Sequence, residues 1–296
     1  MDIKTVRSDK IYRDLISRED KRAYFRENVL KPFKPKFDIQ QVPLESNSFD
    51  VFNVLEMLHY LPEEVNSSHV SEIDLISSDE LWENCRASLA QSLKIFKDNG
   101  IKLNVSEYLF TILLGRRDNH LFRLNHGCIG EGGIPGYITI SITPNKESIQ
   151  RIPGVIAHEI NHNVRYQYIQ WTENVSLAEW VIAEGLAENY VESILGSSYL
   201  GPWVTKTDLD MLNNLIKPSF KDKMALSGME AIMPYIYGDD VIIAQGGAPI
   251  GLPYAAGYTL GYYLMKHYLA ETGKNVVEAT ILEPNKILKE VDSFWN

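Results

Sequence analysis

The chain has 296 residues, 45% hydrophobic and 23% charged, a composition typical of a globular protein with one large domain or a main domain and an appendage. Its net charge of −10, without any Lys- or Arg-rich run, argues against nucleic acid as a main partner. The polar N-terminus has no apolar signal segment, and no apolar stretch is long enough to span a bilayer, so we expect a cytoplasmic protein without a membrane span. Two cysteines are too few for a disulfide framework or a cysteine-rich zinc site.

Residues 1–75 are predicted to form a helical N-terminal extension. This segment is rich in charge and has only a thin apolar stripe, prolines interrupt its middle, and an apolar helix resumes over 51–61. His59 and His69 each stand apart from any second ligand-type residue at metal-binding spacing. We therefore interpret both histidines as ordinary surface or core residues.

The middle of the chain alternates between helical and extended patterns. A helix is predicted over 78–97, an extended run over 101–114 and a short strand over 121–124. A glycine-rich loop over 127–136 and a β-branched strand over 137–142 follow. The loop holds five glycines in ten residues. No Gly-Lys-Ser/Thr follows it and the next element is a strand, which excludes a phosphate-binding loop.

A predicted helix over 153–170 contains His158-Glu159-Ile160-Asn161-His162, the pattern His-Glu-x-x-His. Positions i and i+4 lie one turn apart on the same face of a helix, so His158 and His162 can turn both imidazoles toward one ion. Glu159 lies about a hundred degrees round the helix, where it can reach a water bound to the metal. Ile156 and Ile160 fall on the opposite face, which is expected to pack on the sheet.

A second helix, predicted over 175–195, carries two carboxylates inside its apolar stripe. Glu184 and Glu188 share this stripe with leucines, valines and a tryptophan. Each would cost several kcal/mol if buried without a partner, so both must meet cations, hydrogen-bond donors or a metal. Glu179 falls on the far face as a solvated charge. Gly185 and its alanine neighbours are small enough to let another helix approach closely.

These residues predict a catalytic zinc site. Two histidines, one glutamate and a water form a well-known ligand set for zinc, and Glu184 lies 22 residues beyond His162 on a helix that can fold back. Glu188, one turn further on, is placed to accept the free N–H of a ligand histidine, most plausibly His158. Glu159 would take a proton from the water and pass it to the leaving amine.

The motifs HEINH and EGLAE resemble the gluzincin pattern of metalloproteases. Together with GYITISITP, LAEWVIAEGLAENY and LPYAAGYTLGYYL they are similar to the DUF2268, or YjaZ-like, family of predicted zinc-dependent proteases, over roughly residues 125–270. The resemblance implies an α+β fold with a zincin-like catalytic domain over 76–296. A small mixed β-sheet would pack on the His-Glu-x-x-His helix, followed by a mainly helical C-terminal part. It also implies a Zn²⁺ cofactor held by His158, His162 and Glu184, with Glu159 as general base.

Two further roles follow from the resemblance. Gluzincins commonly stabilise the oxyanion with a Tyr or His from a later helix, and Tyr258, between Gly257 and Gly261, is the candidate. The alternative is that Tyr258 is one of 16 tyrosines packed on an amphipathic helix. In zincins an edge strand binds the extended substrate, and 137–142 would take this role unless it is an interior strand.

The expected activity is hydrolysis of peptide bonds in a peptide or unfolded protein. Two other hypotheses stay open: a catalytically weak or inactive zinc-site protein that acts as a peptide-binding or regulatory module, and a hydrolase of non-peptide amides. The oligomeric state does not follow from the sequence.

Overall fold

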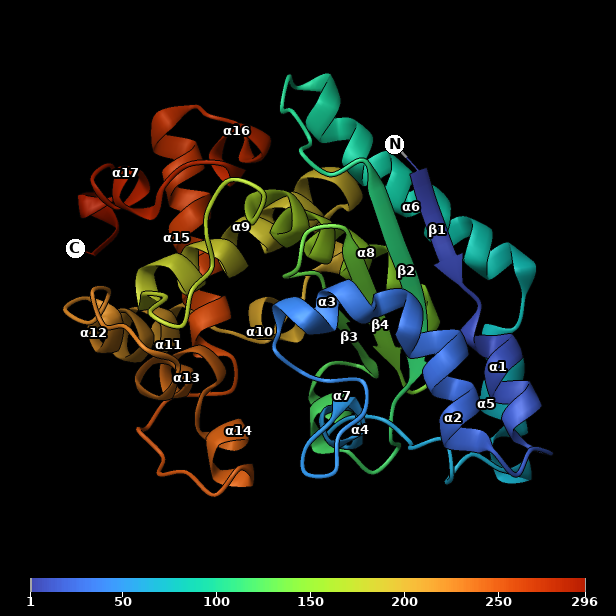
Figure 1. Ribbon diagram of the computed structural model, residues 1–296. Helices are drawn as coiled ribbons and strands as arrows, with labels where there is room; N and C mark the ends of the chain where they lie inside the picture. Colours follow the sequence, from blue (N-terminus) through green and yellow to red (C-terminus); the bar gives the residue numbers. More distant parts are fainter. Residues whose placement is uncertain (1, 296) are drawn as a thin grey trace. The chain divides into compact units, whose positions relative to one another are not determined.

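A computed structural model describes residues 2–295, which divide into two compact units. The first unit takes in the chain up to Lys94 together with Leu103–Asn163, and the second takes in Ile95–Lys102 together with the chain from Val164 onward. Within the described residues no helix has the length and apolarity needed to cross a bilayer. Figure 1 shows the elements, coloured along the chain.

The first unit is an α+β unit built on one small sheet. Its strands are β1 (Asp2–Val6), β2 (Glu107–Leu114), β3 (Cys128–Glu131) and β4 (Tyr137–Ile142). Its helices are α1 (Ser8–Leu15), α2 (Lys21–Phe25), α3 (Lys34–Ile39), α4 (Val51–Glu56), α5 (Val70–Ile76), α6 (Asp79–Asp98), α7 (His120–Leu124) and α8 (Lys146–Arg165), with short turns of π- or 3-10 helix at Arg26–Leu30, Lys31–Phe33 and Ser67–His69. The last residues of α6 and α8 belong to the second unit.

The sheet has the strand order β1-β2-β4-β3 and is mixed, as predicted. β1, β2 and β4 run parallel, and β3 pairs antiparallel with β4. The strand at 137–142 is found with the predicted bounds, but it lies inside the sheet, so its expected place at the edge was wrong. The edge beside it is β3, which the sequence analysis had assigned to a glycine-rich loop.

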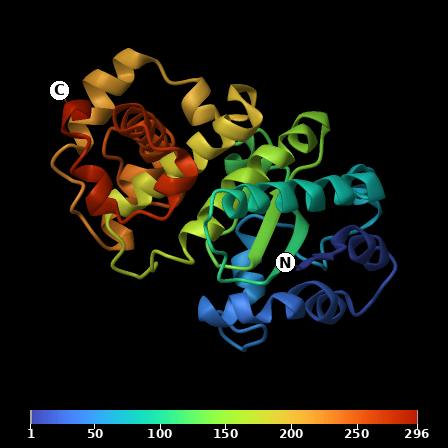
Figure 2. The same ribbon diagram turned by 90° about the horizontal axis from the view of Figure 1, so that it is seen from above.

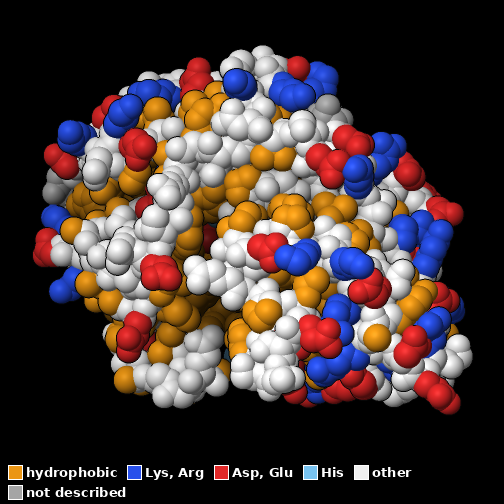
Figure 3. All heavy atoms as spheres, in the orientation of Figure 1, with side chains coloured by type: hydrophobic (Ala, Val, Ile, Leu, Met, Phe, Trp, Pro, Cys, Tyr) orange, Lys and Arg blue, Asp and Glu red, His pale blue; other side chains and the backbone are white. Residues whose placement is uncertain are grey.

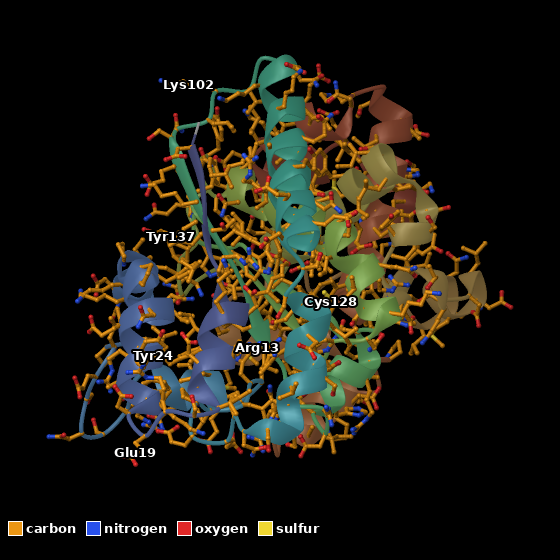
Figure 4. All side chains as sticks on the ribbon, turned by 90° about the vertical axis from the view of Figure 1, so that its right-hand side faces the viewer. Arg13, Glu19, Tyr24, Lys102, Cys128 and Tyr137 are labelled. Carbon is orange, nitrogen blue, oxygen red and sulfur yellow. The ribbon has the colours of Figure 1, made fainter. Side chains whose placement is uncertain are left out.

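Helices cover both faces of this sheet. Phe110 of β2 packs on Trp82 of α6, with ring centroids 5.8 Å apart, whereas Tyr137 of β4 packs on Phe33 of the N-terminal helices, at 6.0 Å. Successive strand residues point to opposite faces, so even-numbered residues of β2 and β4 face α6, and odd-numbered ones face the N-terminal helices. Figures 2 and 4 show the sheet between these two layers. Burial on both faces explains why β2 reads as a nearly continuous apolar run.

Three expectations for this unit need correction. Residues 2–75 are not helical throughout, because β1 pairs with β2 in the sheet. The predicted strand over 121–124 is the helix α7, which the side chain of Asn119 caps. Helix α8 begins at Lys146, before Pro153, because Asn145 accepts hydrogen bonds from the backbone N–H groups of Glu147 and Ser148. The domain boundary placed after residue 75 stays a prediction.

The regular elements of the second unit, within its described residues, are all helices. It contains α9 (Leu177–Leu195), α10 (Pro202–Thr205), α11 (Leu209–Met211), α12 (Lys217–Phe220), α13 (Met229–Tyr237), α14 (Asp239–Ala244), α15 (Ala256–Thr272), α16 (Val276–Thr280) and α17 (Pro284–Leu288), with π- or 3-10 turns at Ser197–Tyr199, Leu212–Ile216 and Asp292–Trp295. The mainly helical C-terminal part was predicted.

Helices α9 and α15 form the centre of this unit. A Cβ atom at Gly185 would lie 2.0 Å from the carbonyl oxygen of Gly261, and one at Gly261 would lie 2.2 Å from that of Val181. Only glycine permits two helix backbones to approach this closely. The close approach expected from the small residues of α9 is therefore present, and its partner is α15.

Charged side chains of both signs are mixed over the surface seen in Figure 3. Many of them are paired, as in Arg22–Glu63, Lys31–Glu27 and Lys34–Asp38. Exposed pairs of this kind contribute little stability each, so the fold rests mainly on its buried apolar contacts.

Candidate metal centre

Helix α8 brings the two histidines of the motif together. His158 and His162 are 9% and 7% exposed, and their Nε2 atoms lie 3.0 Å apart. Their ring centroids are 4.7 Å apart with the planes at 77°. Ile156 and Ile160, fully buried, occupy the opposite side of the helix as predicted. Two nitrogens that both present lone pairs at this distance favour a cation or a proton between them.

The glycine-rich segment is fastened to α8 by Asn163, which the sequence analysis did not single out. Its side-chain amide donates to the carbonyl oxygens of Gly132 and Ile134, both at 2.9 Å, and its oxygen accepts from the backbone N–H of Gly136. Asn163 has no exposed surface. The sequence offered one signal for this role: Asn163 directly follows His162 on the same helix. A buried amide there needs several hydrogen-bond partners.

Glu159 lies directly beneath β3. A Cβ atom at Gly130 would lie 2.4 Å from the Oε1 atom of Glu159, and one at Gly132 would lie 2.4 Å from its carbonyl oxygen. The Glu159 side chain is 7% exposed. Gly130 therefore makes room for the Glu159 carboxylate and Gly132 for the Glu159 backbone, rather than for a phosphate.

Helix α9 positions Glu184, which is 5% exposed. The indole Nε1 of Trp180, one turn earlier, donates a hydrogen bond of 3.0 Å to its Oε1. Ser176 caps the helix by accepting from the backbone N–H of Glu179 at 3.1 Å. Trp180 was assigned to the apolar stripe, and its i, i+4 spacing to Glu184 was the signal for this contact.

His158, His162 and Glu184 form a group that can hold a metal ion, each offering one ligand atom, and these atoms all lie within 4.8 Å of one another. Ligands bonded to zinc at its usual distances stand about 3.3 Å apart in a tetrahedron. Two imidazole nitrogens and one carboxylate oxygen are donors that zinc accepts readily. The donor types therefore fit zinc, and the two imidazole Nε2 atoms, 3.0 Å apart, stand close to that tetrahedral spacing.

Tyr237 lies near Glu184, and Tyr258 lies beside Tyr237. Tyr237, at the end of α13, packs on Trp180 with ring centroids 5.6 Å apart, and Tyr258 of α15 lies 6.3 Å from Tyr237. Burial and then the negative charge of Glu184 raise the pKa of Tyr237 above its ordinary range, although a hydrogen bond with Tyr258 opposes this. Tyr237 was not predicted as a site residue, because its place beside Glu184 depends on how α13 packs against α9.

The remaining glutamates of α9 are also buried. Glu188, 2% exposed, accepts a hydrogen bond of 3.1 Å from the backbone N–H of Gly201, so one of its oxygens has a donor partner. Its predicted hydrogen bond with His158 stays a prediction. The solvated position expected for Glu179 was wrong: it is 4% exposed and forms an ion pair with Arg165. Helical periodicity assigned this face of α9 to solvent because it cannot show a partner, such as Arg165, that comes from outside the helix.

Comparison with known proteins assigns the chain to a family. Residues 81–289 match the family described as "Predicted Zn-dependent protease (DUF2268)". The chain is 31% identical over 289 residues to "Uncharacterized protein YjfC" of Bacillus subtilis (strain 168), an alignment that covers 96% of each chain. No solved structure matches the chain.

Proposed function

Because this chain belongs to the DUF2268 family of predicted Zn-dependent proteases, we propose that it is a zinc-dependent peptidase of the gluzincin type. The observation that carries this proposal is the convergence of His158, His162 and Glu184 on one point. Its substrates would be peptides or unfolded proteins, with no role for nucleic acid or membrane.

Each residue of the site then has a defined part. His158 and His162 would bind the ion through their Nε2 atoms, and Glu184 through a carboxylate oxygen, with Trp180 holding that carboxylate in place. Bound zinc would supply Lewis acidity, which polarises the scissile carbonyl and acidifies the attacking water.

Glu159 is the proposed general base. Its carboxylate would take a proton from the attacking water and later deliver it to the departing amine. The carboxylate lies against the backbone of Gly130, which limits the positions that the side chain can take. A base held in one position loses little entropy at the moment of proton transfer.

Tyr258 and Tyr237 are both candidates for stabilising the oxyanion. Tyr258 is the residue proposed by resemblance, and its hydrogen bond with Tyr237 places two phenols in one network. We expect the phenol that touches the oxyanion to lose roughly a hundred- to a thousand-fold in kcat when changed to Phe. Comparing Tyr258→Phe with Tyr237→Phe by steady-state kinetics will identify which one it is.

Strand β3 is the proposed docking strand for the substrate. Among residues 2–295 it pairs with β4 on one side and with no strand on the other. An extended peptide can add to such an edge through backbone hydrogen bonds. Gly130 on this strand touches Glu159, so a peptide bound along β3 would run past the proposed base.

The decisive experiment measures metal content and activity on the full chain. Elemental analysis of purified protein is expected to find one zinc per chain. Glu159→Gln should keep that zinc while hydrolysis of a mixed peptide library falls by roughly a hundred- to ten-thousand-fold. Glu83→Gln, an exposed glutamate of α6, is the matched control and should change neither quantity.

The possible outcomes separate the three hypotheses. Absence of stoichiometric zinc, or full activity in Glu159→Gln, would refute the proposal. A complete zinc site with no cleavage of any peptide would favour a peptide-binding module, and cleavage of small amides alone would favour the non-peptide hydrolase.

A further inference from the structure

The first unit encloses a second feature with the properties of a binding site. A cavity of about 230 Å³ lies between the N-terminal helices and the sheet, with Leu30 and Phe33 on one side and Thr111 and Ser141 on the other. A buried cavity of about 150 Å³ is enough to hold benzene. This cavity has room for a molecule of about nine non-hydrogen atoms.

The cavity lies on the sheet face turned away from α8. The Cα of Gly130 directs its missing side chain toward Glu159, a residue of α8. The neighbouring residue Glu131 and its cross-strand partner Thr139 therefore point to the other face, where both line the cavity. The cavity is thus separate from the Glu159 carboxylate, although β3 borders both.

Apart from Lys36 and Gln40, the helical side of the cavity is apolar. Leu30, Phe33, Phe37, Leu55 and Leu58 line it, and all but Leu58 belong to the buried core. Two of these side chains are aromatic, which suits a ligand with a flat apolar body. Burial of such a body supplies most of the affinity in sites of this kind.

The side of the cavity nearer the sheet carries polar groups, and the hydroxyl of one of them makes no hydrogen bond to another residue within 2–295. Ser141 and His59 satisfy each other: the Ser141 hydroxyl donates to His59 Nε2 at 2.7 Å, and His59 Nδ1 donates to the carbonyl oxygen of Leu55 at 3.1 Å. Thr139 is only 5% exposed, its hydroxyl makes no hydrogen bond to another residue within 2–295, and its oxygen keeps accessible surface, so it opens onto the cavity. The hydroxyl therefore has hydrogen-bonding capacity left toward the cavity, and a ligand atom that accepts or donates there would use it.

The cavity has no uncompensated charge. The buried Lys36 ammonium lies 2.6 Å from a carboxylate oxygen of Glu131, and Gln40 donates to the other oxygen at 2.9 Å. Burial lowers the pKa of His59 to about 4, so the imidazole is neutral at pH 7. A charged ligand would lose its hydration here without gaining a counter-ion, so a neutral ligand is favoured.

We propose that this cavity binds a small neutral molecule with an apolar, preferably aromatic body and one hydroxyl or carbonyl group that hydrogen-bonds to Thr139. The site is independent of the metal centre, and its test needs no hydrolytic activity.

Three probes of equal size test the proposal on the full chain. 2-Phenylethanol, n-propylbenzene and 2-phenylethylammonium each have nine non-hydrogen atoms and differ only in the terminal group. Ligand-observed NMR and calorimetry should give 2-phenylethanol a Kd on the order of 1 mM, and 2-phenylethylammonium at least about tenfold weaker binding. Absence of saturable 2-phenylethanol binding, or equal binding of the cation, would overturn the proposal.

Two variants locate the binding. Thr139→Val keeps the β-branched shape and should weaken 2-phenylethanol roughly five- to tenfold without weakening n-propylbenzene. Thr143→Val, beyond the end of β4, is the matched control and should change neither Kd. Val54, which lines the cavity and is 37% exposed, should tolerate Val54→Trp, and the added ring should abolish binding of both probes. If Thr139→Val acts no differently from Thr143→Val, or binding survives Val54→Trp, the site is wrong.

Discussion

The buried ion pair between Arg165 and Glu179 gives the sharpest test of stability, through the substitution Arg165→Met. The guanidinium has no exposed surface and donates from Nε to Glu179 at 2.8 Å. It also donates from Nη1 to the backbone carbonyl oxygens of Thr280 and Leu282, at 2.8 and 3.0 Å. One side chain thus joins the end of α8, the start of α9 and the segment after α16.

The expected cost follows from what the substitution leaves behind. Methionine fills most of the volume, but it removes the partner of a carboxylate that is only 4% exposed. Breaking a buried pair from one side costs about 3–5 kcal/mol, because the remaining charge has no compensation. The two carbonyl groups that lose a donor add to the loss, so we expect a value at the upper end of that range.

Urea denaturation at pH 7, followed by far-UV circular dichroism, measures this loss. Arg86→Met provides the matched control, because Arg86 pairs with Glu83 on the exposed side of α6 with both side chains more than half exposed. That change should cost at most about 1 kcal/mol. Adding Glu179→Leu to Arg165→Met should recover part of the stability, since the unpaired charge is then gone. Equal losses in Arg165→Met and Arg86→Met would refute the reasoning.

Three further results are expected. Gly185→Ala would place a Cβ atom 2.0 Å from the facing carbonyl oxygen of α15, so it should lower the free energy of unfolding by about 1–3 kcal/mol. The control Gly133→Ala has open space around the new Cβ atom and should lower the free energy of unfolding by less than about 0.5 kcal/mol. Burial lowers the pKa of His59 from 6.5 to about 4. Between these two pH values the unfolded chain binds a proton at His59 and the folded chain does not, so the free energy of unfolding should fall by up to about 3 kcal/mol as the pH drops from 6.5 to 4. Urea melts between pH 4 and pH 7 should show a shallower fall for His59→Gln, and an unchanged slope would exclude His59 as the cause. Trp180→Phe removes the hydrogen bond that orients Glu184 and should weaken zinc binding about 10- to 100-fold in a competition titration with a chelator, and unaltered affinity would show that the indole has no such role.

Local sequence patterns were sufficient for much of the fold and for proposing the candidate metal ligands. The spacing of His158 and His162 is a property of any helix, and Glu184 was recognised because a carboxylate in an apolar stripe needs a partner. The folded chain brings ligand atoms of these three residues within 4.8 Å of one another. The helices over 78–97 and 175–195 and the strand over 137–142 were found within about two residues of their expected bounds, because their signals lie within each element.

Two of the features that sequence reasoning missed depend on partners outside their own element. Strand β3 exists because β4 supplies its hydrogen bonds, and a segment so rich in glycine has no strand preference of its own. Glu179 is buried because Arg165, from another helix, pairs with it. The Arg165 guanidinium is itself held by the carbonyl oxygens of Thr280 and Leu282, more than a hundred residues further along the chain.

By itself the sequence therefore singled out His158, His162 and Glu184 as candidate metal ligands, since ligand type and helical spacing are local properties. Only the tertiary structure decided what surrounds them. It placed Gly130 against Glu159, Tyr237 near Glu184 and Thr139 in a cavity without a partner. The physical reason is that periodicity assigns a side chain to a face of its element, whereas the packing of distant elements decides what that face meets.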